Sequence, residues 1–114
     1  MMRWILLAAG LVLVGGGVAR ADGIQTGEQL LANCQSSKPE ETASCHTYVS
    51  GTVDAFHTNQ AITFWCIFMP TDGFSEEKAV ETVVAYLKAH PDQLQMSGAY
   101  NIRAALVEAY PCPQ

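Results

Sequence analysis

Four cysteines and three histidines are the residues of this 114-residue chain whose types and spacing could support chemistry. A structural zinc site or a redox pair would place two cysteines in a Cys-x-x-Cys motif, and the chain contains no such motif. A cysteine nucleophile would need a free thiol, whereas an even number of cysteines in an exported chain is typical of complete pairing. We therefore expect the cysteines to form structural disulfides.

Four cysteines allow three pairings, and their order along the chain favours one of them. Cys34 and Cys45 flank a short predicted helical hairpin, and Cys66 and Cys112 flank a longer one. Closing loops of these lengths is expected to stabilise the fold by about 3 and about 4 kcal/mol. The preferred prediction is Cys34–Cys45 together with Cys66–Cys112, and the other two pairings stay open.

The histidines and the paired carboxylates do not form a recognisable reactive site. His46 and His57 could share one face of a helix, but ~16 Å of helix axis would separate them, which is too far for one ion. His90 fits the end of a helix. Glu76 and Glu77 follow a serine and fit the first turn of a helix, where negative charge is favourable. The sequence therefore predicts no catalytic residue, no metal, no cofactor and no enzyme.

Residues 1–21 have the pattern of a cleaved signal peptide. Arg3 supplies a positive start, residues 4–18 are uncharged and apolar, and Ala19-Arg20-Ala21 is a small-x-small cleavage site. The apolar run is shorter than the ~20 residues that a membrane-spanning helix needs. We expect cleavage near Ala21, a mature domain over residues 22–114, and a periplasmic location in which disulfides persist.

The charge of the mature chain excludes two classes of partner. Removing Arg3 and Arg20 leaves four Lys/Arg against eleven Asp/Glu, a net charge of about −7. Nucleic acids and anionic lipids are both bound through Lys and Arg, so we expect neither a nucleic-acid partner nor membrane binding after cleavage. A protein partner, and in particular a basic one, is compatible with this charge.

Two helices are predicted before residue 60. Thr26 and Gln29 form a capping-box motif that predicts a helix over residues 27–34. A second helix is expected to begin either near Lys38 or later, with Ser44 as its cap. Its inward residues recur at helical spacing: Cys45, Tyr48, Val49, Val53 and Phe56.

Gly51 lies inside this second helical pattern, where glycine costs about 1 kcal/mol relative to alanine. We interpret it as a position where another backbone passes close to the helix. Asp54 follows three residues later on the same side of the predicted helix, and we therefore expect it to face a helix contact rather than open water.

The second half of the chain predicts another helical hairpin. Residues 61–69 are apolar almost throughout, and we interpret them as an extension of the second helix followed by an irregular buried segment. A buried strand is the alternative, although no second strand is available to pair with it. Ser75 and Ser97 are predicted caps of a third and a fourth helix, with Pro91 stopping the third. The expected inward residues are Val80, Val83, Val84, Leu87, Ala99, Ile102, Leu106 and Ala109.

Taken together, these elements predict an all-α protein. We expect a small bundle of four to five helices, arranged as two helical hairpins and held by two disulfides. The mature chain shows no internal repeat, low-complexity tract or linker that would divide it, so a single domain is expected.

An ordered set of residues carries a family resemblance. It comprises Cys45-x2-Tyr48-x2-Gly51-x2-Asp54, Trp65-Cys66, Tyr86-Leu87, His90-Pro91, Ala105-Leu106 and Tyr110-Pro111-Cys112-Pro113. This set resembles the Rap/Tai group of periplasmic immunity proteins, which protect users of type VI secretion against their own peptidoglycan amidase effectors. The resemblance covers residues 30–113, nearly the whole mature chain.

The resemblance implies a helical homodimer that blocks the active-site cleft of an amidase with loop and helix surface. Four residues look like fold-maintaining positions of such a scaffold: Tyr48, Gly51, Asp54 and Pro91. Exposure and loop position suggest the residues that would contact the amidase: Phe68, Asp72, Phe74, Glu76 and Glu77.

Two other functions stay open on the sequence. One is a periplasmic acid-stress chaperone, which would dissociate and bind many clients at a pH of roughly 3 to 4, where carboxylates lose their charge. The chain has no histidine-rich segment that would act as a pH switch, which weakens this reading. The other is an orphan envelope protein built on the same scaffold, which nothing in the sequence distinguishes from an immunity protein.

Overall fold

The structure is a computed structural model that describes residues 24–59, 67 and 74–113. Its elements are α1 (Gly27–Cys34), α2 (Pro39–Asn59), α3 (Glu76–Ala89), the 3-10 turn η2 (Pro91–Gln93) and α4 (Gly98–Ala109). In the described part, extended pairing is limited to two isolated bridges, Thr26 with Ser97 and Ile67 with Pro111. The prediction of an all-α fold is confirmed.

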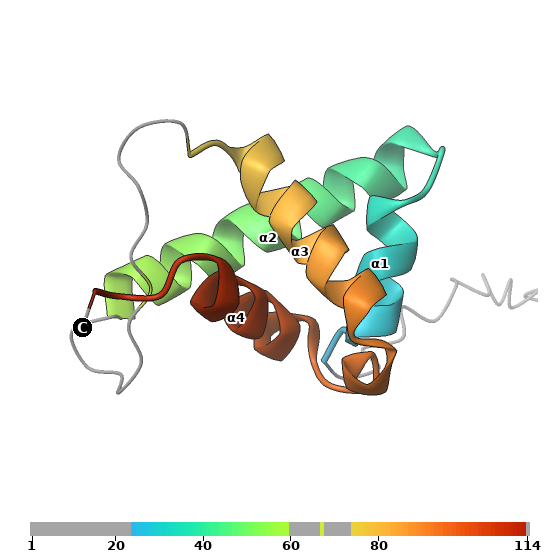
Figure 1. The fold of residues 1–114 in the computed structure, drawn as a ribbon. Helices are drawn as coiled ribbons and strands as arrows, with labels where there is room; N and C mark the ends of the chain where they lie inside the picture. The colour runs from blue at the N-terminus through green and yellow to red at the C-terminus, as the bar shows by residue number, and fades with distance from the viewer. Residues whose placement is uncertain (1–23, 60–66, 68–73, 114) are drawn as a thin grey trace, which may run out of the picture.

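The four α-helices pack as one unit in which each contacts the other three. Figure 1 shows α3 crossing over the long helix α2, with α1 and α4 on opposite sides of the C-terminal half of α3. The short α1 is joined to α2 by a disulfide between Cys34 and Cys45, whose Cα atoms are 5.1 Å apart. The predicted first bridge and first hairpin are therefore present.

Each α-helix contributes one face of apolar side chains to the core. Its fully buried members include Leu30 of α1, Cys45 and Val49 of α2, and Val83 and Leu87 of α3. On α4 the buried residues follow a spacing of three and one along the helix: Gly98, Asn101, Ile102, Ala105 and Leu106. Ala109, which we expected to face inward, is exposed: it continues the spacing of this stripe, but it is the last residue of α4 and borders an open hollow between α3 and α4.

The predicted helix starts agree with the structure where a serine or threonine caps the helix. Thr26 and Gln29 form the reciprocal capping box of α1, and the hydroxyls of Ser75 and Ser97 accept hydrogen bonds from backbone N–H groups of α3 and α4. The second helix begins at Pro39, near Lys38, which was the first of the two alternatives. Pro91 follows α3 immediately and opens η2, as expected.

Asn101 lies at a corner that joins the start of α1, the turn after α3 and the start of α4. Its Nδ2 donates to the carbonyl oxygens of Gln93 and Ser97, each at 3.0 Å. Asn101 is fully buried, and it is the buried polar residue of the described core. We call residues 25–28 with residues 93–101 the Asn101 corner.

Backbone hydrogen bonds complete the Asn101 corner. The N–H groups of Gly27 and Glu28, which have no acceptor within α1, donate to the carbonyls of Met96 and Leu94 at 2.8 and 3.0 Å. Gly27 must be small here, because a Cβ at this position would lie 2.5 Å from Nδ2 of Asn101. The first-turn donors of α1 are thus satisfied by a segment about seventy residues later in the chain.

The expected close backbone contact at Gly51 is wrong. Gly51 is exposed, and a Cβ built on it meets no atom within 4 Å. Its occurrence in the interior of α2 therefore reflects an open surface and not the approach of a second element. Close approaches in this fold occur instead at Gly27 and at Gly98, where a Cβ would lie 2.9 Å from Cε1 of Tyr48.

Part of the second predicted bridge lies outside the described residues. Cys112 is disulfide-bonded, and Cys66 is not among the residues that the structure describes. The same holds for most of residues 61–69, so the expected helix extension there is untested, although Ile67 is buried and pairs with Pro111. One of the two predicted disulfides is thus seen directly.

Candidate partner-binding surface

The start of α3 brings two of the predicted contact residues to the surface. The hydroxyl of Ser75 accepts a hydrogen bond from the N–H of Lys78 at 3.1 Å, which fixes the first turn. Glu76 and Glu77 occupy that turn and are exposed. Their negative charge is favoured at a helix N-terminus because the unpaired N–H groups there carry partial positive charge.

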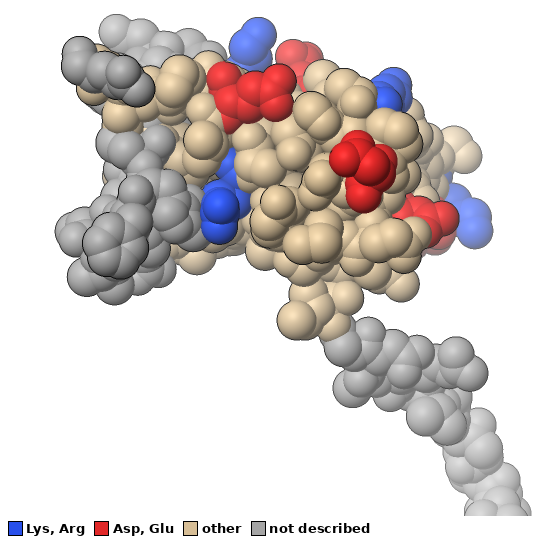
Figure 2. Space-filling view, turned by 60° about the horizontal axis from the view of Figure 1, so that its bottom comes forward, with Lys and Arg blue, Asp and Glu red and all other residues tan. Residues whose placement is uncertain are grey.

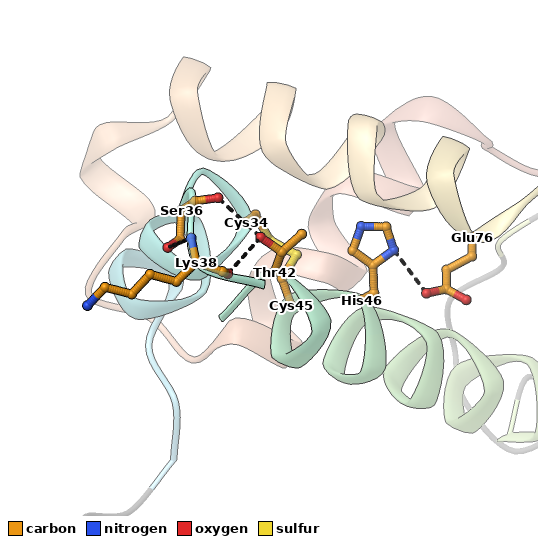
Figure 3. The surroundings of a disulfide bond; sticks show 7 residues. All are labelled: Cys34, Ser36, Lys38, Thr42, Cys45, His46 and Glu76. Carbon is orange, nitrogen blue, oxygen red and sulfur yellow. Dashed lines mark hydrogen bonds and ion pairs between the residues drawn. A yellow bond between two sulfur atoms is a disulfide. The ribbon is translucent and has the colours of Figure 1, made fainter. Parts of the chain in front are cut away.

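Glu76 is also held by a neighbouring helix. Its Oε1 lies 3.0 Å from Nδ1 of His46 on α2, and both side chains are partly exposed. Figure 3 shows the His46 ring reaching from α2 toward Glu76 at the start of α3. An exposed pair of this kind adds little stability, so its main effect is to orient the Glu76 carboxylate.

Helix α2 also carries the disulfide to α1, at Cys45, the residue directly before His46. The Thr42 hydroxyl lies within hydrogen-bond distance of the carbonyls of Ser36 and Lys38, at 3.1 and 3.2 Å. Figure 3 shows these residues around Cys34 and Cys45, at the end of α2 that precedes His46. The start of α2 is therefore fixed relative to α1, and this holds the backbone of His46 in place.

Phe74 anchors the segment that leads into α3. Its ring packs edge-on against the ring of Tyr110, with centroids 5.6 Å apart and planes at 80°. Phe74 is half-buried and packs against the core. This contact links the start of α3 to the residue that ends α4, so Phe74 presents only part of its ring to a partner.

A surface hollow of about 180 Å³ lies between α2 and the start of α3. Its lining includes Asp54 from α2 together with Phe74 and Glu76. We call it the acidic hollow, defined by the residues Ser50, Val53, Asp54, Phe74, Ser75, Glu76 and Ala79. The sequence had assigned Asp54 to the scaffold and Phe74 and Glu76 to the partner contact, whereas the fold places all three around one depression.

The other predicted site residues are distributed elsewhere. Tyr48 is half-buried against Gly98, which is consistent with a role in the scaffold. Glu77 is on the first turn of α3 but does not line the acidic hollow. Phe68 and Asp72 lie outside the described residues, so the structure does not test them.

A second and larger hollow lies between α3 and α4, and the sequence reasoning did not identify it. It has a volume of about 400 Å³, and we call it the α3–α4 groove. It is lined by Thr82, Ala85, Tyr86, Ala89, His90, Ala105, Glu108 and Ala109. The signal available in the sequence was the repeat of Ala85-Tyr86 and Ala89-His90 four residues apart, which places two small and two aromatic residues on one face of α3.

Three side chains form the polar wall of the α3–α4 groove. The rings of Tyr86 and His90 stack with centroids 4.1 Å apart, and Nε2 of His90 lies 3.4 Å from Oε2 of Glu108 on α4. Burial raises the pKa of Tyr86 above its ordinary value of 10.0, and the nearby Tyr100, Glu108 and Asp92 raise it further. Glu108 thus supplies the carboxylate among the residues that line the groove.

The described residues contain no cluster of three or more His, Cys, Asp or Glu side chains able to hold a metal ion. On the face shown in Figure 2, the charged side chains stand as separate groups on a largely uncharged surface. Within the described part of the chain, no helix has the length and apolar character needed to cross a membrane.

One family model matches most of this chain. The family model described as Rap1a immunity proteins matches residues 26–112. The match begins at the N-cap of α1, ends at Cys112 and includes all four α-helices. The chain belongs to this family.

An immunity protein acts by binding a partner effector protein, so the two hollows of this Rap1a protein are candidate binding surfaces. Neither the curated proteins nor the solved structures include a match to this Rap1a protein. The assignment of its binding surface therefore rests on the chain's own geometry.

Proposed function

We propose that this Rap1a protein is a periplasmic immunity protein that binds and inhibits a peptidoglycan amidase effector of type VI secretion. Residues 1–21 would act as a signal peptide that is cleaved near Ala21, and residues 22–114 would form the inhibitor. The observation that carries the proposal is the family match over residues 26–112. No catalytic residue is required of an inhibitor that acts by covering a cleft.

The acidic hollow and the adjacent Glu77 are our preferred contact surface for the amidase. Three features support this choice: Glu76 is oriented by His46, Glu76 and Glu77 are exposed at a helix start, and Asp54 faces the same depression. The segment just before this surface contains Phe68 and Asp72, which we propose as further contacts. With a net charge of about −7 for the mature chain, a basic rim around the amidase cleft would attract and orient this surface.

We further propose that the mature protein is a homodimer and that Cys112 is bonded to Cys66. Cys112 is disulfide-bonded, and Cys66 is the cysteine left over by the Cys34–Cys45 bridge. The second bridge would join the segment before α3 to the end of α4. It would thereby hold the proposed contact segment against the helical core.

The proposal is tested by using the oxidised mature protein as bait in a periplasmic extract. We expect one amidase to co-purify in stoichiometric amount and to lose its activity on peptidoglycan. Glu77→Lys should weaken inhibition by at least tenfold, because it reverses a charge on the proposed surface. Glu28→Lys is the matched control, since Glu28 is equally exposed and occupies the same second position of its helix, α1.

Three results would speak against this function. Unchanged amidase activity at saturating protein would contradict inhibition. Equal weakening by Glu77→Lys and Glu28→Lys would leave inhibition standing but contradict the proposed surface. Capture of many unrelated proteins at a pH of roughly 3 to 4, with no amidase at neutral pH, would instead indicate the acid-stress chaperone.

A further inference from the structure

The α3–α4 groove has an apolar floor and a negative rim. Its floor is made of small side chains that leave the depression open: Ala85, Ala89, Ala105 and Ala109. Neither lysine nor arginine is among the residues that line it. The carboxylate of Glu108 is 65% exposed at the rim, so a ligand in the groove can reach it.

The negative charge at the groove comes from more than one element. Glu108 belongs to α4, and Asp92 belongs to η2, which follows α3. Burial is the main cause of the raised pKa of Tyr86, and Glu108 and Asp92 raise this pKa further. The position of Glu108 in the groove lining places its carboxylate at the rim. His90 approaches Glu108 through a single nitrogen, at 3.4 Å from Oε2, which leaves the charge of the groove negative when His90 is neutral.

We propose that the α3–α4 groove is a second protein-binding surface, which accepts an arginine or lysine side chain of a partner protein. The aliphatic stem of such a side chain would lie on the alanine floor, and its charged end would reach the Glu108 carboxylate. Long basic side chains bury their stems on apolar surface while their charged heads pair at the rim. Arginine fits best, because its planar guanidinium can pair with both carboxylate oxygens.

This surface is distinct from the one assigned to the amidase. The acidic hollow lies at the Glu76 end of α3, and the groove extends to the His90 end. No residue lines both hollows, although they approach each other along α3, where the acidic hollow ends at Ala79 and the groove begins at Thr82. The acidic hollow takes its carboxylates from α2 and α3 (Asp54 and Glu76), and the groove takes its carboxylate from α4 (Glu108). The inference therefore goes beyond the proposed function and does not depend on the identity of the effector.

The probe for the groove is a capped tripeptide, acetyl-Gly-Arg-Gly-amide, added to the 15N-labelled, oxidised mature protein at low salt. We expect weak binding, with a Kd of order mM, and NMR shifts concentrated on the lining residues of the groove. Glu108→Gln should reduce the affinity at least threefold, whereas Glu28→Gln on α1 should leave it unchanged. The corresponding Gly-Gln-Gly peptide should produce no comparable shifts.

A second pair of variants tests the shape of the groove independently of its charge. Ala85→Leu fills the floor and should abolish the shifts, while Ala43→Leu, at an exposed position on α2, should not. Absence of shifts in the unmodified protein, equal binding to the Glu108→Gln variant, or shifts centred on Glu76 and Glu77 would each overturn the proposal. Because amidase activity is not measured here, such a result would leave the proposed function untouched.

Discussion

Asn101 shows how one buried amide can hold three elements together. Its Nδ2 donates to the carbonyls of Gln93 and Ser97, and its side chain packs against Gly27 at the start of α1. Burying a polar group costs free energy unless it is hydrogen-bonded. Here the hydrogen bonds of Asn101 Nδ2 hold the turn after α3. Carbonyl groups of the same turn accept hydrogen bonds from the first N–H groups of α1. The residue therefore contributes to the order of the whole Asn101 corner.

Replacing this amide should measurably destabilise the protein. Asn101→Ala is expected to lower the free energy of unfolding by about 1 to 3 kcal/mol, since it removes the hydrogen bonds of a fully buried side chain and leaves a cavity in its place. Urea denaturation followed by circular dichroism measures the change. Gln95→Ala, at an exposed position of the same turn, is the control and should have little effect. Equal stability of the two variants would contradict the role assigned to Asn101.

Two glycines should respond to alanine in opposite directions. At position 27 a Cβ would lie 2.5 Å from Asn101 Nδ2, whereas at position 51 it meets nothing within 4 Å. Gly27→Ala is expected to destabilise the fold by about 1 to 3 kcal/mol through overpacking. Gly51→Ala should stabilise it by about 0.5 to 1 kcal/mol, because alanine is the better helix former. If Gly51→Ala instead lowered the stability, the result would contradict an uncovered Gly51 and would support the fold-maintaining role that the family resemblance implies.

Tyr86 should titrate at a higher pH than an ordinary tyrosine. Burial first, and then Tyr100, Glu108 and Asp92, raise its pKa above 10.0. A raised pKa in the folded state means that the stability contributed by neutral Tyr86 is present below pH 10 and is lost as the pH rises through the folded-state value. The absorbance titration of the protein minus that of Tyr86→Phe should show this late-titrating phenol. A difference curve centred at or below pH 10 would contradict it.

At the scale of elements, α1 depends on its connections. It has only eight residues, and an isolated helix of this length is marginal in water. The Cys34–Cys45 bridge joins its C-terminal end to α2, and the Asn101 corner receives its N-terminal end. Both ends of the helix are thus fixed by residues outside it.

Removing this bridge should loosen α1 before the rest of the fold. The double variant Cys34→Ala/Cys45→Ala is expected to lose about 3 kcal/mol of stability from loop closure, with a further loss because Cys45 is fully buried. Hydrogen exchange should show the amides of α1 losing more protection than those of α3 and α4. A uniform loss across all four helices would contradict a local role of the bridge.

At the scale of the whole molecule, the proposed bridge between Cys66 and Cys112 would decide how the segment before α3 is attached. Non-reducing digestion of the exported protein should yield one peptide pair joining Cys66 to Cys112 and another joining Cys34 to Cys45. The mass of the intact chain should correspond to a start at Asp22, with all four thiols oxidised. A disulfide that links Cys112 to a second molecule would contradict the proposed pairing while retaining the dimer.

The parts of the fold that could be predicted are those governed by local interactions. Helix starts at Thr26, Ser75 and Ser97 follow from the hydrogen bond between a cap and the first turn, which involves residues three apart. The end of α3 follows from the backbone restriction before Pro91. The Cys34–Cys45 bridge was predictable because it closes a short hairpin between two adjacent helices.

The candidate site was only partly predictable. Glu76 and Glu77 could be placed on a helix start from their order after Ser75. Their neighbours could not, because Asp54 and His46 reach the start of α3 only through the crossing of α2 and α3. The wrong expectation for Gly51 has the same origin, since a helical pattern shows which residues share a face but not which element covers that face.

The sequence by itself determined that this protein is helical, disulfide-linked and a member of the Rap1a family, because caps, periodicity and cysteine order are properties of neighbouring residues. Only the tertiary structure decided what each helix face meets. It placed Asn101 in the core, left Gly51 uncovered, and formed the acidic hollow and the α3–α4 groove. The physical reason is that these features depend on the angles at which helices cross, and those angles are set by the packing of all the helices together.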